Sequence, residues 1–174
     1  MVVSGVWNKD KGLYDFHRLR VLLNPNEYEI ILVGLSKEQV KELPDGITGI
    51  EHTESVKELA ELYASAMVFV NPTYADTFPT VNLEALACGT PVITYKIGGS
   101  LEAISDETGW VVEQGDIEAV VSIIKSIEQQ QEGEVFTQRK ACRERAEREF
   151  DNNKCFEKYI DLYKNLIDHH DKLE

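Results

Sequence analysis

Short apolar segments alternate along this chain with segments whose apolar residues recur at helical spacing. Residues 28–35, 67–70 and 91–95 are nearly continuous apolar runs, which are typical of strands buried on both faces of a parallel sheet. Between such runs lie helical stripes, for example Leu13, Phe16 and Leu19. This alternation allows few folds other than a parallel sheet covered by helices on both faces.

The expected fold is therefore α/β: a Rossmann-like doubly wound parallel sheet with additional C-terminal helices. We assign residues 1–128 to the sheet domain and 129–172 to helices packed on it, and interpret 173–174 as a remnant of cloning. The charged C-terminal helices are expected at 135–149 and 154–169. Strands are expected at 1–6, 28–35, 47–50, 67–70, 91–95 and 110–112, and helices after positions 12, 35, 55, 78 and 116.

Composition excludes several classes of protein. The net charge of −13 over 174 residues opposes nucleic-acid binding, which needs clustered Lys and Arg. No apolar run approaches the length of a membrane span, and the chain starts in a strand rather than in a leader. The cysteines at 88, 142 and 155 form no close pair, so we expect reduced thiols and a cytoplasmic protein.

Ligands of such sheets bind beyond the carboxyl ends of the strands, so the loops after positions 6, 34, 50, 72 and 95 should line one functional edge. Pro79 suits the first position of a helix, and the N–H groups of Thr80, Val81 and Asn82 would then be available to a phosphate. The alternative is that Asp76 or Thr77 simply caps this helix.

Glu84 follows one turn later, in a helix that is otherwise apolar or small on nearly every face. An enclosed carboxylate needs a partner, and the hydroxyls of a ribose would supply one; the alternative is that Glu84 reaches solvent. Lys9 and Lys11 lie in the loop after the first strand and could neutralise a diphosphate, although each alone could be a solvated surface lysine. Gly98 and Gly99 would let backbone approach a ligand, or would make a turn.

The sequence lacks the motifs of metal sites, of dinucleotide-dependent redox enzymes and of hydrolases with a nucleophile elbow. There is no Asp-x-Asp pair or CxxC, and residues 168–171, although rich in Asp and His, read as a polar tail, so no metal is expected. A Gly-x-Gly-x-x-Gly after the first strand and a Gly-x-Ser-x-Gly are also missing, which counts against dinucleotide redox and hydrolase chemistry.

The segment from Asn71 to Glu102 resembles the donor-binding, C-terminal half of retaining glycosyltransferases of GT-B fold, family 4. In that family a Glu, seven residues and a second Glu precede Ala-x-Ala/Ser-x-Gly-x-Pro-Val; here Asp76, seven residues and Glu84 precede Ala-Leu-Ala-Cys-Gly-Thr-Pro-Val. The resemblance extends from Gly5 to about Val121.

The resemblance implies roles for individual residues. Asp76 would contact the transferred sugar and is the catalytic candidate, and Glu84 would bind the ribose hydroxyls. Lys11 would match the lysine of the family's Arg…Lys-Gly loop, and the backbone around Phe78–Val81 would hold the donor phosphates. Two departures are the shorter Asp at 76 and the absence of the family's arginine near the end of strand one, where Val6 or Trp7 stands and Lys9 could compensate.

The implied function is metal-independent transfer of a sugar, with retention, from a UDP-linked or similar donor to an acceptor hydroxyl in bacterial polysaccharide or cell-surface glycan synthesis. The partners would be the nucleotide sugar and an N-terminal acceptor-binding domain, through which membrane association would arise. This chain alone should bind nucleotide weakly and turn over nothing. Two alternatives stay open: a nucleotide-sugar epimerase of similar architecture, and a non-catalytic flavodoxin-like interaction module. The last helix either crosses to the other domain or packs on its own sheet.

Overall fold

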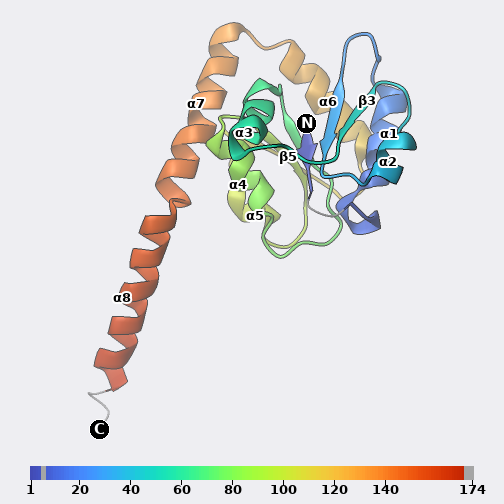
Figure 1. Ribbon diagram of the computed structural model, residues 1–174. Helices are drawn as coiled ribbons and strands as arrows, with labels where there is room; N and C mark the ends of the chain where they lie inside the picture. The colour runs from blue at the N-terminus through green and yellow to red at the C-terminus, as the bar shows by residue number, and fades with distance from the viewer. Residues whose placement is uncertain (5–6, 171–174) are drawn as a thin grey trace.

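The computed structural model describes residues 1–4 and 7–170, and it is an alternation of parallel strands and helices (Figure 1). The elements, in chain order, are β1 (Val2–Val3), the 3-10 helix η1 (Lys9–Lys11), α1 (Leu13–Leu22), β2 (Ile30–Val33), α2 (Lys37–Lys41), β3 (Ile47–Ile50), α3 (Val56–Ser65), β4 (Phe69–Asn71), α4 (Thr80–Ala87), β5 (Val92–Tyr95), α5 (Ser100–Ala103), β6 (Gly109–Val112), α6 (Ile117–Glu128), α7 (Glu132–Glu149) and α8 (Asn152–His170).

The strands form two parallel ladders that meet at β1 and β4. One ladder has the order β1-β2-β3 and the other β4-β5-β6. The Met1 carbonyl accepts a hydrogen bond from Val70 N at 3.0 Å, and the Met1 amine donates to the Val68 carbonyl at 3.0 Å. The spatial order is therefore β3-β2-β1-β4-β5-β6, the Rossmann order, with its topological switch point between β1 and β4. The predicted fold class is confirmed.

Helices cover both faces of this sheet, as right-handed crossovers require. On one face α1 packs against α6, and on the other α4 packs against α3 and α7 (Figure 1). The core between these layers is apolar, and its fully buried side chains include Phe16, Leu19, Leu32, Phe69, Leu86, Ile93, Ile117 and Val120.

Several boundaries differ from those expected. Residue Gly34 lies beyond β2, because it takes a φ of 93° that only glycine adopts readily. Pro79 is the N-cap of α4 rather than its first residue. Met67, which we expected to begin a strand, lies before β4 and is 39% exposed. The helices η1 and α5 were not expected, and positions 5–6 and 171–174 lie outside the described residues.

The two C-terminal helices behave differently. The helix α7 packs against α4 and buries Cys142 and Ala146, as expected for residues that cover the sheet domain. By contrast, α8 continues away from the sheet (Figure 1), and its apolar side chains stay more than half exposed. The expectation that all of 129–172 packs on the sheet domain is therefore wrong for α8, while the domain boundary at 128 stays a prediction.

Every helix in the part of the chain that the structure describes is too short or too polar to cross a lipid bilayer. Within the described residues, Cys88, Cys142 and Cys155 form no disulfide bond.

Candidate functional site

Lys11 ends a tight turn at the carboxyl edge of the sheet. The Asn8 side chain accepts a hydrogen bond from Lys11 N at 3.0 Å and so caps η1. Gly12 then reverses the chain with a φ of 72°, and a Cβ there would clash with the carbonyl oxygen of Pro72. Glycine at position 12 therefore lets the Lys11 turn press against the loop that follows β4.

Asp76 lies in that loop and faces Lys11 directly. Its Oδ2 is 2.6 Å from Lys11 Nζ, and its Oδ1 accepts a hydrogen bond from Phe78 N at 3.2 Å. The side chains of Lys11 and Asp76 are 32% and 19% exposed, so the ion pair is partly shielded from water. The structure thus brings together Lys11, the candidate for a diphosphate, and Asp76, the candidate for a sugar that the family resemblance implied.

The helix α4 begins immediately behind this pair. Among the described residues no side chain caps it, so the alternative role for Asp76 or Thr77 as its cap is not observed. The N–H groups of Thr80 and Val81 belong to the first turn, where an α-helix offers no internal acceptors. The helix start is therefore a source of free N–H donors and of positive potential.

A cavity of about 470 Å³ joins these features. Of the predicted site residues it contains Lys11, Asp76, Phe78, Thr80 and Val81. Its remaining walls come from β1 and the end of β4, from the loops after these strands and from the N-cap of α4, namely Val2, Ser4, Trp7, Asn8, Asn71, Pro72 and Pro79. The site thus lies at the switch point of the sheet, where Rossmann-like domains hold their ligands.

The glycine pair supports this cavity without lining it. Gly99 N donates to the Thr77 carbonyl at 2.8 Å. A Cβ on Gly98 would clash with the Asp76 carbonyl, and one on Gly99 would clash with that of Thr77. The close backbone approach expected of these glycines is made to the Asp76 loop, which they hold in place.

Glu84 is placed differently from what its apolar neighbours suggested. It is an exposed residue, so its expected enclosure is wrong, because α4 turns this position outward. Its Oε2 accepts a hydrogen bond from the buried Tyr63 hydroxyl at 3.0 Å, and it does not line the cavity. Burial, followed by the charge of Glu84, holds the pKa of Tyr63 far above its ordinary value. Glu84 therefore has a neutral protein partner and a surface open to a ligand.

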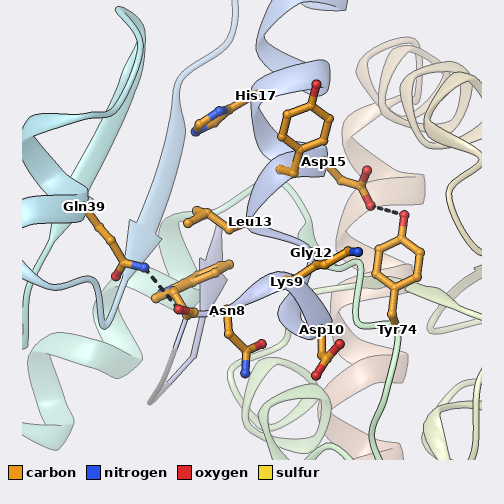
Figure 2. Close-up of a pocket in the computed structure, with 11 residues that line it drawn as sticks. Asn8, Lys9, Asp10, Gly12, Leu13, Asp15, His17, Gln39 and Tyr74 are labelled. Atoms are coloured by element: carbon orange, nitrogen blue, oxygen red, sulfur yellow. Dashed lines mark hydrogen bonds between the residues drawn. The ribbon is translucent and has the colours of Figure 1, made fainter.

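Lys9 belongs to a second, larger cavity of about 680 Å³ beside the first (Figure 2). This cavity lies over the start of α1, and Trp7 and Asn8 line both cavities. Trp7 is buried, and its Nε1 donates to the Val33 carbonyl at 2.8 Å, so the indole anchors the loop after β1. The expected compensation by Lys9 is not seen, because Lys9 is exposed and faces the second cavity.

Some residues at the site were missed by the sequence analysis. Asn71 ends β4 and lines the cavity of about 470 Å³, and its Nδ2 donates to Asn82 Oδ1 at 2.8 Å. Behind the loop and outside the lining of this cavity, the buried Asp15 carboxylate accepts hydrogen bonds from the buried Tyr95 and from Tyr74, which is 37% exposed. A polar residue at the carboxyl end of a buried strand was the available signal for Asn71 and Tyr95.

Metal ligation was not expected from the sequence. Within the described ranges, no group of three or more His, Cys, Asp or Glu side chains is placed to hold a metal ion. The side chains at 168–171 lie outside the described part of the chain.

Comparison with known proteins identifies the family. Residues 1–130 match the sequence pattern of the family described as "Glycosyl transferases group 1". The chain belongs to this glycosyltransferase family. The capsular polysaccharide biosynthesis glycosyltransferase CapM of Staphylococcus aureus is 27% identical over 128 residues, which cover 68% of this chain and 34% of the relative. A D-inositol 3-phosphate glycosyltransferase of Saccharomonospora viridis is 31% identical over 124 residues, covering 71% of this chain and 28% of the relative.

Solved structures share this fold. Sucrose-phosphate synthase from Thermosynechococcus elongatus superposes with a TM-score of 0.79 at 28% identity, covering 97% of this chain and 45% of that one. Anabaena Alr3699/HepE in complex with UDP gives a TM-score of 0.81 at 21% identity, covering 94% and 48%. This chain therefore spans about a third of the length of the curated relatives and just under half of the solved ones.

Proposed function

We propose that this chain is the donor-binding domain of a retaining, family 4 glycosyltransferase of GT-B fold, which uses a nucleoside diphosphate sugar. The observation that carries the proposal is the cavity at the switch point, where Lys11, Asp76 and the uncapped start of α4 converge. An ammonium and free N–H groups suit a diphosphate, and a carboxylate beside them suits sugar hydroxyls. The solved complexes of the Anabaena relative with UDP and UDP-glucose favour UDP as the nucleotide.

The proposed chemistry is electrostatic. As the bond between sugar and diphosphate breaks, negative charge grows on the leaving diphosphate. Lys11 and the N–H groups of Thr80 and Val81 would stabilise that charge in place of a metal ion. Asp76 would orient the sugar, and Glu84, steadied by Tyr63, would accept hydrogen bonds from the ribose.

The remaining parts of the function belong to the whole protein. The acceptor site would lie in a second Rossmann-like domain, consistent with relatives that are about twice as long. The relationship to a capsular polysaccharide enzyme favours an acceptor in polysaccharide or cell-surface glycan synthesis. We propose a cytoplasmic site of action, with residues 1–128 as the nucleotide-sugar domain and 129–172 as its C-terminal extension.

Calorimetric titration of this chain with UDP, GDP and ADP tests the proposal. We expect UDP to bind with a Kd of about 0.1–1 mM, because half of the active-site cleft contributes only part of the contacts. Absence of binding by all three nucleotides at millimolar concentration would refute the proposed donor site.

A Glu84→Ala variant tests the ribose contact separately. Losing hydrogen bonds to a charged acceptor should raise the Kd for UDP about tenfold while the chain stays folded. Glu107→Ala is the matched control, because Glu107 is also exposed but precedes β6 at the opposite edge of the sheet. Equal UDP affinity in the two variants would remove Glu84 from the site.

A further inference from the structure

Asp15 is a buried carboxylate that the proposed sugar transfer does not use. It is only 3% exposed, and its Oδ2 accepts hydrogen bonds from the Tyr74 hydroxyl at 2.7 Å and the Tyr95 hydroxyl at 2.9 Å. Figure 2 shows the first of these bonds, between α1 and the loop after β4. Its Oδ1 lies 3.5 Å from Arg18 Nη1. Hydrogen bonds to a carboxylate are stronger than those between neutral groups, so both phenols are firmly held.

These bonds are not needed to build α1. Asp15 lies in the first turn of that helix, yet within the described residues no side chain caps the helix start. A carboxylate in the first turn would interact equally well with the helix dipole if it were exposed to solvent. Burial of Asp15 against two tyrosines from other elements therefore indicates a role between elements.

The positions of the two tyrosines define that role. Tyr74 precedes Asp76 by two residues, and Asp15 follows Lys11 by four. Tyr95 ends β5, just before the glycine pair that supports the Asp76 loop. The rings of Tyr74 and Tyr95 also pack edge to face, with centroids 5.4 Å apart. One carboxylate oxygen thus connects the segments that carry both members of the Lys11–Asp76 ion pair.

A second tether joins the same segments on the other side of Lys11. The Asp10 carbonyl accepts hydrogen bonds from Tyr74 N at 2.7 Å and from Thr73 Oγ1 at 3.2 Å. The loop is therefore attached to the backbone one residue before Lys11 and to a side chain four residues after it. Together with the Gln114 Nε2 bond to the Tyr74 carbonyl at 3.1 Å and the Gly99 N bond to the Thr77 carbonyl, these attachments fix the orientation of the loop.

We infer that Asp15 is a positioning residue, which acts through Tyr74 to hold the Asp76 carboxylate against the Lys11 ammonium. The significance of this contact for sugar transfer rests on the proposed function, but the contact itself does not. Tyr95 serves as an internal comparison, because its hydroxyl bonds the same oxygen while its backbone is held by β5–β6 pairing opposite Val112.

NMR of the 15N-lysine-labelled chain tests the inference without any ligand. An ammonium held in an ion pair exchanges its protons with water slowly, and Lys11→Gln assigns the signal by removing it. In Tyr74→Phe we expect the Lys11 ammonium exchange rate to rise about threefold or more, because the loop loses a hydrogen bond to a charged acceptor. In Tyr95→Phe it should change less than about twofold, because the strand still holds that backbone.

The exchange rates of the two tyrosine variants decide whether the inference holds. Equal exchange rates in the two tyrosine variants, whether raised or unchanged, would overturn the inference. Where Tyr74→Phe is too unstable to study, Asp15→Asn replaces it: the amide keeps the volume of the side chain but not its charge, and the same rise in exchange rate is expected.

A second measurement links the contact to turnover in the full-length protein that contains this chain. Tyr74→Phe should lower kcat about tenfold with UDP affinity unchanged, whereas Tyr95→Phe should leave kcat unchanged. If the unaltered protein neither binds UDP nor transfers sugar, the proposed function fails, and the exchange measurement still decides the role of Asp15.

Discussion

Lys11 and Asp76, 65 residues apart in sequence, form a 2.6 Å ion pair across the mouth of the cavity at the switch point. The pair joins a group suited to a diphosphate with a group suited to a sugar. In the absence of donor, each neutralises the other. A bound diphosphate would bring negative charge to a lysine that already has an anionic partner.

This arrangement predicts that removing the carboxylate tightens nucleotide binding. Asp76→Asn should bind UDP about fivefold more tightly, because roughly 1 kcal/mol of repulsion disappears and Lys11 is released. Sugar transfer by the full-length protein should nevertheless be lost. Calorimetry at low and high salt measures the gain, which should shrink as salt screens the charges.

Lys11→Met provides the opposite control for that experiment. It should raise the Kd for UDP about tenfold, since methionine keeps the apolar part of the lysine side chain but lacks the ammonium. Weaker UDP binding by Asp76→Asn than by the unaltered chain would contradict a diphosphate at this position.

Gly12 should be intolerant of any side chain. Its φ of 72° disfavours other residues, and an added Cβ would clash with the Pro72 carbonyl. Gly12→Ala should therefore lower the free energy of unfolding by about 2–4 kcal/mol, as measured by denaturant titration. Gly133→Ala is the matched control, because nothing lies within 4 Å of its added Cβ, and it should be neutral or stabilising by up to about 1 kcal/mol. Similar losses in the two variants would show that the clash at Gly12 is relieved.

The sequence carried enough information to place the loops but not their side-chain partners. Apolar runs and helical stripes indicated a doubly wound parallel sheet, and hence the edge at which the loops that carry Lys11 and Asp76 lie. The bonds from Tyr63 to Glu84 and from Tyr74 to Asp15 join residues 21 and 59 apart, and no periodicity encodes such pairs. The sequence does not show that the buried Tyr63 hydroxyl has a partner, because such a partner lies far along the chain.

The misplaced elements have similar explanations. An apolar stripe indicates that a helix has a face to bury, but it does not indicate which element covers that face. The sequence of α8 therefore could not be distinguished from that of a helix packed on its own sheet. Glu84 was expected to be enclosed because its neighbours are apolar, yet α4 is covered on only part of its circumference. In both cases the missing quantity was the position of an element relative to its neighbours.

Stability should fall at alkaline pH through Cys142. Burial raises the pKa of this thiol from 9.0 to about 12 in the folded chain. Between those values the unfolded chain has lost a proton that the folded chain keeps, so stability is fully present below pH 9 and declines as pH rises toward 12. The decline from this group is at most about 1.4 kcal/mol per pH unit.

Cys142→Ser isolates that contribution, because a hydroxyl does not ionise in this range. Denaturant titrations at pH 8, 9, 10 and 11 under reducing conditions should show a shallower decline in the variant. A decline remains in both proteins, since burial also raises the pKa values of Tyr63 and Tyr95. Identical slopes in the two proteins would contradict a neutral, buried thiol.

The last helix should contribute almost nothing to the stability of this chain. The large apolar side chains of α8 are between 51% and 63% exposed. By contrast, α7 buries Cys142 and Ala146, and its arginines donate hydrogen bonds to carbonyls at the C-terminal ends of α3 and α4. Among those bonds, Arg139 Nη1 donates to the Ala66 carbonyl at 3.0 Å and Arg143 Nη1 to the Ala87 carbonyl at 2.6 Å.

Deleting residues 152–174 should therefore change the free energy of unfolding by less than about 1 kcal/mol, because little apolar surface is lost from the folded chain. Deleting 131–174 also removes α7 and should cost several kcal/mol, about 25 cal/mol for each Å² of apolar surface uncovered on α4, plus the lost hydrogen bonds. Denaturant titration of the two truncated chains measures both values. A large loss on removing α8 alone would mean that its apolar face packs against this domain in solution.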